Sequence, residues 1–176
     1  MRFRPSYRLL PLAALAVPVA GQATVYLTPA QAQAQMFPGQ SLTPAFRDLT
    51  PAQLAAIRAA SGDSPLSPRL KAWRAQNGGW FIVDEVIGKH EFITYAVSLD
   101  PTGTVTDVEI LEYREAYGGD VRQAKWLRQF VGKRPGQSLK AGAEIRTISG
   151  ATLSSKHLTD GVRRLLATYA IVLAHG

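Results

Sequence analysis

Small and hydroxyl-bearing residues crowd one stretch near the C-terminus of the chain, Ile148-Ser149-Gly150-Ala151-Thr152-Leu153-Ser154-Ser155. Gly150 and Ala151 carry little or no side chain, so another molecule can approach the backbone closely. A helix that starts near Ser155 would point its unpaired N–H groups and the positive end of its dipole at this turn. That arrangement binds anions, phosphate above all. The same stretch also fits a plain connection between a strand and a helix, in which the serines only cap the helix.

Residues for other kinds of chemistry are missing from this sequence. The 176-residue chain has no cysteine, which excludes disulfides, thiol nucleophiles, iron–sulfur clusters and cysteine-ligated zinc. The dinucleotide, P-loop, HExxH and GxSxG signatures do not occur. Ser155, His157 and Asp160 occur close together, but neighbours on one helix point in different directions, so no catalytic triad is expected. His90, His157 and His175 have no metal-ligand spacing. We therefore expect no catalytic residue and no metal site, and a chain that is not a complete enzyme.

The elements that must position the turn begin with a group of strands. Residues 80–87 are rich in aromatic and β-branched side chains, and residues 92–99 and 104–113 continue in the same way. Gly88-Lys89-His90 and Asp100-Pro101-Thr102-Gly103 are expected to form turns, and the second turn is so short that the two strands it joins should be antiparallel. The second strand alternates and places four residues on one face, Ile93, Tyr95, Val97 and Leu99.

Three shorter helical segments are expected around these strands. Thr50 is a good N-cap and Pro51 suits the first helical position, so a helix should run until Ser61-Gly62. Residues 70–76 favour a short helical turn. Residues 121–131 favour a helix with apolar side chains that either pack into the core or flank a ligand, the core being the usual place for such residues: Trp126, Leu127, Phe130 and Val131.

The C-terminal helix is the clearest element, and it defines the fold class. Residues 155–170 place one apolar stripe at helical spacing, made of Leu158, Val162, Leu165, Leu166 and Tyr169. Polar residues should lie largely away from that stripe: Lys156, Asp160, Arg163, Arg164 and Thr168. A short strand is expected at residues 143–148. Grouped strands with helices at the ends indicate a single α+β domain, with an antiparallel sheet, flanking helices and a long C-terminal helix after the S-G-A-T turn.

The first 34 residues have the three parts of a secretory signal. A leader with three arginines is followed by an apolar run over residues 9–27 and by the small-residue site Ala32-Gln33-Ala34. We expect cleavage after Ala34 and export to the periplasm or another extracytoplasmic space. An N-terminal membrane anchor is the alternative, although Pro11 and Pro18 interrupt the run that would have to span the bilayer.

Removal of the leader changes how the charge of the chain is interpreted. The whole chain has a net charge of +7, and loss of Arg2, Arg4 and Arg8 leaves 7 − 3 = +4. That charge is a weak case for a protein that binds the nucleic-acid backbone, so no nucleic-acid partner is expected. Residues 35–78 then form a tether and an N-terminal helical segment, and residues 79–170 form the domain that carries the S-G-A-T turn.

Three motifs give the chain a resemblance to the FMN-binding domain family. Ser149-Gly150-Ala151-Thr152 is similar to the S/T-G-A-T motif of this family, found in the covalent-FMN subunits of ion-pumping NADH oxidoreductases and in exported bacterial redox proteins. Residues 113–119 and 129–133 resemble its R-E-T-x-G and Q-F-x-G-K segments, in the family's order. The resemblance covers residues 80–166. It implies FMN as the cofactor, joined to Thr152 by a phosphoester that a flavin transferase makes from FAD with magnesium.

The resemblance also implies which residues surround the cofactor. Glu115, Tyr117 and Gly118 would form a loop against the ring or the ribityl chain, the alternative being an exposed hairpin corner. Lys133 would contact the phosphate or only complement the end of its own helix. The full set of implied cofactor-binding residues is Ser149, Gly150, Ala151, Thr152, Leu153, Ser154, Ser155, Glu115, Tyr117, Gly118 and Lys133.

The sequence departs from the family at one position. Six residues before the modified threonine the family usually has aspartate, and this chain has Arg146. Tight non-covalent FMN and a transferase of different preference are therefore alternatives to ordinary modification. Because residues i and i+2 share one face of a strand, we also consider Glu144 as a replacement for the missing carboxylate.

These features predict an exported flavoprotein that carries FMN and transfers electrons outside the cytoplasm. The expected partners are a flavin transferase and a membrane-associated redox protein linked to haem or quinone. One alternative is a flavin-dependent reductase with a small substrate of its own, which a pocket beside the ring would favour. Another is a non-redox exported module that binds an anionic polymer or surface through its basic charge.

Overall fold

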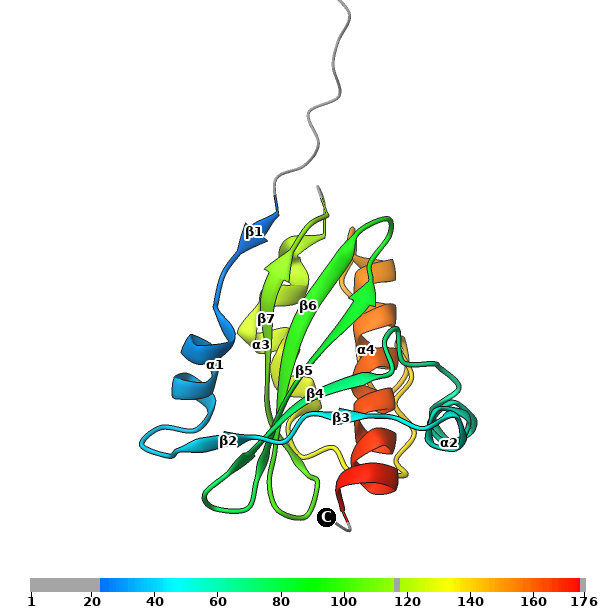
Figure 1. Cartoon of the computed structure of the whole chain (residues 1–176). Helices are drawn as coiled ribbons and strands as arrows, with labels where there is room; N and C mark the ends of the chain where they lie inside the picture. The colour runs from blue at the N-terminus through cyan, green and yellow to red at the C-terminus, as the bar shows by residue number, and fades with distance from the viewer. Residues whose placement is uncertain (1–22, 116–117, 175–176) are drawn as a thin grey trace, which may run out of the picture.

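The computed structural model describes residues 23–115 and 118–174, which form one antiparallel sheet covered by helices (Figure 1). The strands follow the order β1-β7-β6-β5-β4-β2, and β3 pairs with the start of β4. This architecture confirms a single α+β domain. The strands are β1 (Thr24–Val25), β2 (Leu42–Pro44), β3 (Arg47–Asp48), β4 (Arg69–Ala75), β5 (Trp80–Ile87), β6 (Phe92–Leu99) and β7 (Val105–Tyr113).

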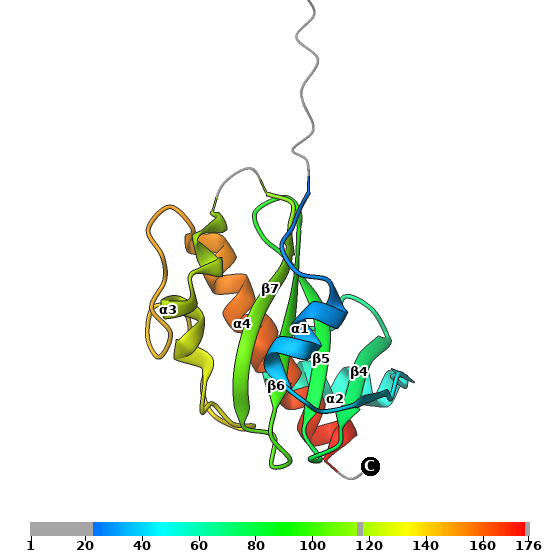
Figure 2. The ribbon, with the colours of Figure 1, turned by 90° about the vertical axis from the view of Figure 1, so that its left-hand side faces the viewer.

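Helices lie on both faces of the sheet (Figure 2). The long helix α4 (Thr152–Thr168) packs on one face together with α2 (Pro51–Ser61) and α3 (Ala124–Leu127). The other face is covered by α1 (Pro29–Met36). Single 3₁₀ turns flank α3 at Gly119–Arg122 and Arg128–Phe130, and a π-helical turn, Tyr169–Leu173, extends α4.

Alternation along the central strands supplies a separate core for each face. In β5, Trp80, Ile82 and Val86 face α4, whereas Phe81 and Val83 face α1. The expected alternation in β6 is confirmed, because its four apolar residues all lie in the core under α4: Ile93, Tyr95, Val97 and Leu99. The sheet is therefore apolar on both sides, and each side needs its own helices to exclude water.

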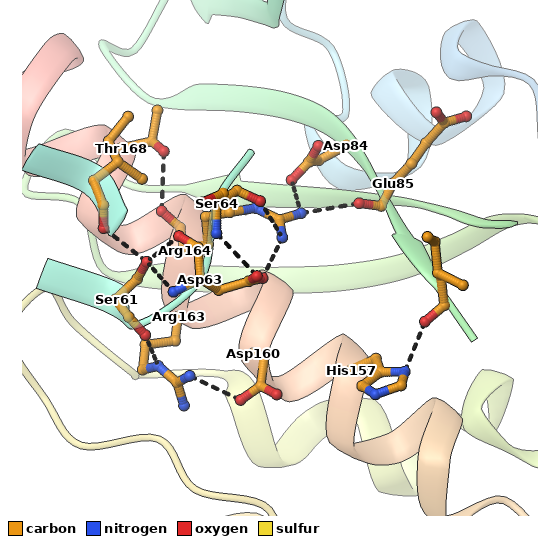
Figure 3. A network of polar contacts seen from close by, with 12 residues as sticks. Ser61, Asp63, Ser64, Asp84, Glu85, His157, Asp160, Arg163, Arg164 and Thr168 are labelled. Atoms are coloured by element: carbon orange, nitrogen blue, oxygen red, sulfur yellow. Dashed lines mark hydrogen bonds and ion pairs between the residues drawn. The ribbon is translucent and has the colours of Figure 1, made fainter. Parts of the chain in front are cut away.

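The apolar stripe of α4 is confirmed, but the prediction for two of its polar residues is wrong. Arg164 and Thr168 are each only 2% exposed. The loop after α2 covers this side of α4, and Arg164 donates from Nη1 to Asp63 and from Nη2 to Asp84 at 2.7 Å and to the carbonyl of Glu85 at 2.9 Å (Figure 3). Asp84 stands at a core-facing position of β5, where it also accepts from the Tyr95 hydroxyl at 3.2 Å, and the arginine balances the charge of this partly buried carboxylate.

Other expectations fail where pairing between distant segments decides the local structure. Residues 70–76 are not helical, because β4 occupies residues 70–75 and pairs with β5, β2 and β3. Residues 143–148 form a loop with a single bridge between Ala141 and Ile145, not a strand. The expected helix at 121–131 is broken into short turns, and although Trp126, Leu127 and Phe130 are buried, Val131 is 45% exposed.

The N-terminal part of the described chain is folded onto the sheet. Thr24 pairs with Tyr113 in β7, a capping box between Thr28 and Gln31 starts α1, and Ala32 is fully buried. The sequence analysis assigned residues 1–34 to a leader and residues 35–78 to a tether with a helical segment, and the structure has β1, α1, β2 and β3 between residues 24 and 48. Removal of the chain up to Ala34 would take away β1 and most of α1. Within residues 23–115 and 118–174, no helix has the length and apolar character needed to cross a bilayer.

Candidate functional site

A cavity of about 580 Å³ opens at the N-terminal end of α4. Three segments form it: the turn between β5 and β6, the loop after β7, and the start of α4 with the residues just before it. Its volume falls within the range of small-molecule and cofactor sites, roughly 300–1,000 Å³. The lining residues are Lys89, His90, Glu115, Gly118, Gly150, Ala151, Thr152, Leu153 and Ser154.

The N-terminus of α4 presents its backbone donors to this cavity. Ala151 is the N-cap residue, and its side chain makes no capping hydrogen bond. The exposed Thr152 hydroxyl has one long hydrogen bond, 3.5 Å to the carbonyl oxygen of Ile148. Ser155 instead ties the turn together, accepting from the Ile148 N–H at 3.2 Å and donating to the Ala151 carbonyl at 2.8 Å. The first N–H groups of a 17-residue helix therefore remain available to an anion beside an accessible hydroxyl.

The loop that leads into this turn is held at Arg146. The indole N–H of Trp126 donates to the Arg146 carbonyl at 2.5 Å, and the Arg146 N–H donates to Oε1 of Gln129 at 2.9 Å. Both backbone polar groups of one residue are thus held, while its side chain is exposed. Glu144 is exposed and accepts from the Lys140 N–H at 3.0 Å. Because residues 143–148 are a loop, the strand argument for Glu144 as a substitute carboxylate no longer applies.

Gly118 packs tightly against the side of the cavity formed by Ser154. Its φ of +88° favours glycine, and an added Cβ would lie 2.7 Å from the Tyr113 hydroxyl and 3.3 Å from Ser154 Oγ. The Tyr113 hydroxyl itself lies 3.3 Å from Ser154 Oγ. Burial raises the pKa of Tyr113 above its ordinary value, so this phenol stays neutral near pH 7.

Glu115 joins the loop after β7 to the hairpin turn on the opposite wall. One of its carboxylate oxygens, Oε1, accepts from the backbone N–H groups of Lys89, His90 and Glu91, the last at 2.9 Å. Gly88 makes room for it, because an added Cβ there would lie 2.7 Å from Oε1. Burial raises the pKa of Glu115, but the three N–H donors outweigh burial and hold it below its usual value.

The structure brings together seven of the residues predicted from sequence: Glu115, Gly118, Gly150, Ala151, Thr152, Leu153 and Ser154. Ser149 and Ser155 adjoin the cavity in sequence without lining it. Lys133 is placed elsewhere, because its carbonyl accepts from the N–H of Val105, at the opposite end of β7 from Tyr113. Tyr117 lies outside the described residues.

The prediction did not include Lys89 and His90. They belong to the hairpin turn, which was recognised as a turn, but its sequence does not reveal that it reaches the start of α4. His157 secures this contact from the helix side, because its Nδ1 lies 2.7 Å from the carbonyl oxygens of Ile87 and Gly88. Lys89 and His90 thus belong to the site only because the hairpin turn packs against the start of α4.

A second cavity, of about 450 Å³, lies further along α4. Its walls include Lys156 from the helix. They also include His157 and Asp160 from the helix and Asp63 from the loop after α2, which are labelled in Figure 3. Its basic side chains already have partners, since Asp160 pairs with Lys156 at 2.9 Å and with Arg163 at 2.8 Å. This cavity is therefore polar but has little unsatisfied charge.

The first cavity fits a phosphate-bearing cofactor by the chemistry of its walls. It combines helix N–H donors and Lys89 for the phosphate, an exposed hydroxyl at Thr152, and two glycines that let a ligand approach the backbone. No curated protein matches the chain. Residues 88–167 match the FMN-binding domain family, and this segment contains every residue that lines the cavity. The match over residues 88–167 identifies this segment as an FMN-binding domain, and the cofactor it indicates is FMN.

Proposed function

We propose that this protein is an exported flavoprotein that carries FMN on Thr152 through a phosphoester and transfers electrons between partners outside the cytoplasm. The observation that carries the proposal is the position of the Thr152 hydroxyl. It is exposed, it lines the 580 Å³ cavity, and it stands in the first turn of a helix whose N-terminal donors no side chain caps. An ester phosphate at this oxygen would be held by those donors and by Lys89.

The protein's own residues bind and orient the cofactor in this proposal. Gly118 and Gly150 keep side chains out of the space next to Thr152. Glu115 and His157 fix the hairpin turn that closes the opposite wall. Bound FMN supplies one- and two-electron chemistry, which no side chain of this cysteine-free chain provides.

Export explains why a covalent link would be useful. A dissociated cofactor would diffuse away from a compartment that does not make it, whereas an ester keeps it at a permanently high local concentration. The basic leader and apolar run of the first residues support export. Because β1 and α1 belong to the fold, we place the end of the leader before Thr24 and not after Ala34. The proposed partners are a flavin transferase and a membrane-associated redox protein linked to haem or quinone.

Co-expression with a flavin transferase tests the proposal. After denaturing electrophoresis, the wild-type band should fluoresce under ultraviolet light and Thr152→Ala should not. Ser149→Ala is the matched control, because it removes an exposed hydroxyl from the same turn without touching the cavity lining. Flavin that is bound before denaturation but lost on denaturation would show that FMN binds tightly without a covalent link. A protein that binds no flavin in either form would refute the proposal.

The second cavity favours one other function, a flavin-dependent reductase with a small substrate. The two cavities lie on either side of the contact between His157 and the hairpin carbonyls. A substrate in the second cavity would therefore sit next to the flavin site. Reduced, flavin-loaded protein mixed with small quinones or organic acids would then be reoxidised at a rate that saturates with one acceptor. Rates that rise linearly with every acceptor would contradict this function.

A further inference from the structure

The two carboxylate oxygens of Glu115 differ in their hydrogen bonding. All its hydrogen bonds to described residues end on one oxygen, Oε1, where three consecutive backbone N–H groups converge. Three N–H groups directed at one point form an anion nest, and here a side chain of the same chain fills it. None of the residues in 23–115 and 118–174 donates to the second oxygen, Oε2, and Glu115 lines the FMN cavity.

The nest favours an ionised Glu115 even though the side chain is partly buried. N–H donors stabilise the charged form of a carboxylate, which keeps the proton off at neutral pH. Lys89 brings a positive charge to the same wall, but its side chain is exposed to water, which screens it. A fixed negative charge therefore remains beside the space that the cofactor occupies.

We propose that Glu115 lowers the redox potential of the bound FMN by holding a negative charge in the cofactor cavity. The proposal rests on FMN occupying this cavity, as in the proposed function. Reduction adds negative charge to the ring, and a nearby carboxylate opposes it by Coulomb repulsion. Loss of this charge should shift the ratio of reduced to oxidised flavin at a given potential by about tenfold, or ~30 mV for a two-electron couple.

Glu115→Gln separates the charge from the structural role. The amide keeps a carbonyl oxygen that can accept from the three N–H groups, so the hairpin keeps its anchor while the charge disappears. Glu91→Gln is the matched control, because it makes the same change in the same turn on an exposed side chain that does not line the cavity. Circular dichroism of both variants checks that the fold is retained.

The measurement is equilibrium reduction of the purified, flavin-loaded proteins against reference dyes. A potential that rises in Glu115→Gln and stays at the wild-type value in Glu91→Gln supports the proposal. An unchanged or lower potential in Glu115→Gln overturns it, as does an equal rise in both variants. If Glu115→Gln fails to fold, the wild-type potential measured at rising salt replaces it: screening of the carboxylate should raise the potential, and a potential that does not rise with salt overturns the proposal. A wild-type protein without flavin would instead refute the proposed function, so the two failures are distinguishable.

Discussion

Three glycine-to-alanine replacements separate backbone strain from obstruction of the cavity that we propose for FMN. Gly118, Gly132 and Gly150 have φ values of +88°, +82° and +82°. Alanine in this left-handed region costs ~1–2 kcal/mol. The reduced conformational entropy of the unfolded chain returns ~0.4–1 kcal/mol. A net loss of ~1 kcal/mol is expected from strain alone, which lowers the melting temperature by ~2–4 °C in a chain of this size.

The three positions differ in what an added Cβ would meet. At Gly132 nothing lies within 4 Å, and the residue does not line the cavity, so Gly132→Ala reports strain alone. At Gly150 nothing lies within 4 Å either, but the new methyl group would stand in the cavity beside Thr152. At Gly118 the Cβ would lie 2.7 Å from the Tyr113 hydroxyl, so overpacking adds a further ~1–3 kcal/mol.

Thermal unfolding of the apo proteins and their flavin loading provide the two readouts. Gly132→Ala and Gly150→Ala should lose equal stability, and Gly118→Ala should lose more. Gly132→Ala should load like the wild type, whereas Gly150→Ala should bind FMN roughly tenfold more weakly, the equivalent of ~1.4 kcal/mol of lost contact. Equal loading of Gly150→Ala and Gly132→Ala would refute close approach of the cofactor to this backbone, and with it our assignment of the cavity.

Four further predictions concern the surroundings of the site. Gln129→Leu removes the acceptor for the backbone N–H of Arg146, in the loop that leads to Thr152. This change should lower the initial rate of flavin attachment with little change in melting temperature. Arg164→Met leaves a partly buried carboxylate without its cation and should lower the free energy of unfolding in urea by ~3 kcal/mol, mostly through Asp84, because the side chain of Asp84 is 21% exposed and that of Asp63 is 38% exposed. A chain that begins at Thr24 should be fully stable, whereas one that begins at residue 35 lacks β1 and most of α1 and should melt at least ~5 °C lower. The pKa of Glu115 is lower in the folded protein than in the unfolded chain. The stabilisation that this carboxylate gives the fold is therefore complete above its unfolded pKa, about 4.3, and is lost as the pH falls through its folded pKa. Glu115→Gln should remove this part of the dependence of the free energy of unfolding on pH.

Local periodicity was enough to predict the elements that carry the largest apolar faces. The stripe of α4, the alternation of β6 and the capped helix α2 are all confirmed, because the spacing of their side chains matches the period of the element. The start of α4 was recognisable for a different reason. Its glycine, alanine and hydroxyl residues form a motif whose chemistry depends on a few neighbouring positions.

Long-range partners explain the errors. Residues 70–76 have helix-compatible composition, yet pairing with β5 on one edge and with β2 and β3 on the other makes them a strand. Arg164 has the spacing of a surface residue, and only the position of the loop after α2 shows that it is buried. Lys89 and His90 reach the site because their hairpin turn contacts the start of α4, and no short sequence pattern predicts this long-range contact.

The pairing of β1 with the end of β7 determines where the chain enters the fold. Thr24 lies opposite Tyr113, whose hydroxyl is next to Ser154 at the cavity, so the entry point and the cofactor site share one end of the sheet. Tyr26 strengthens this end by packing against the guanidinium of Arg122, 4.1 Å from its ring. In the proposed function, a redox partner bound near this entry point would therefore meet the end of the domain that carries the candidate cofactor cavity.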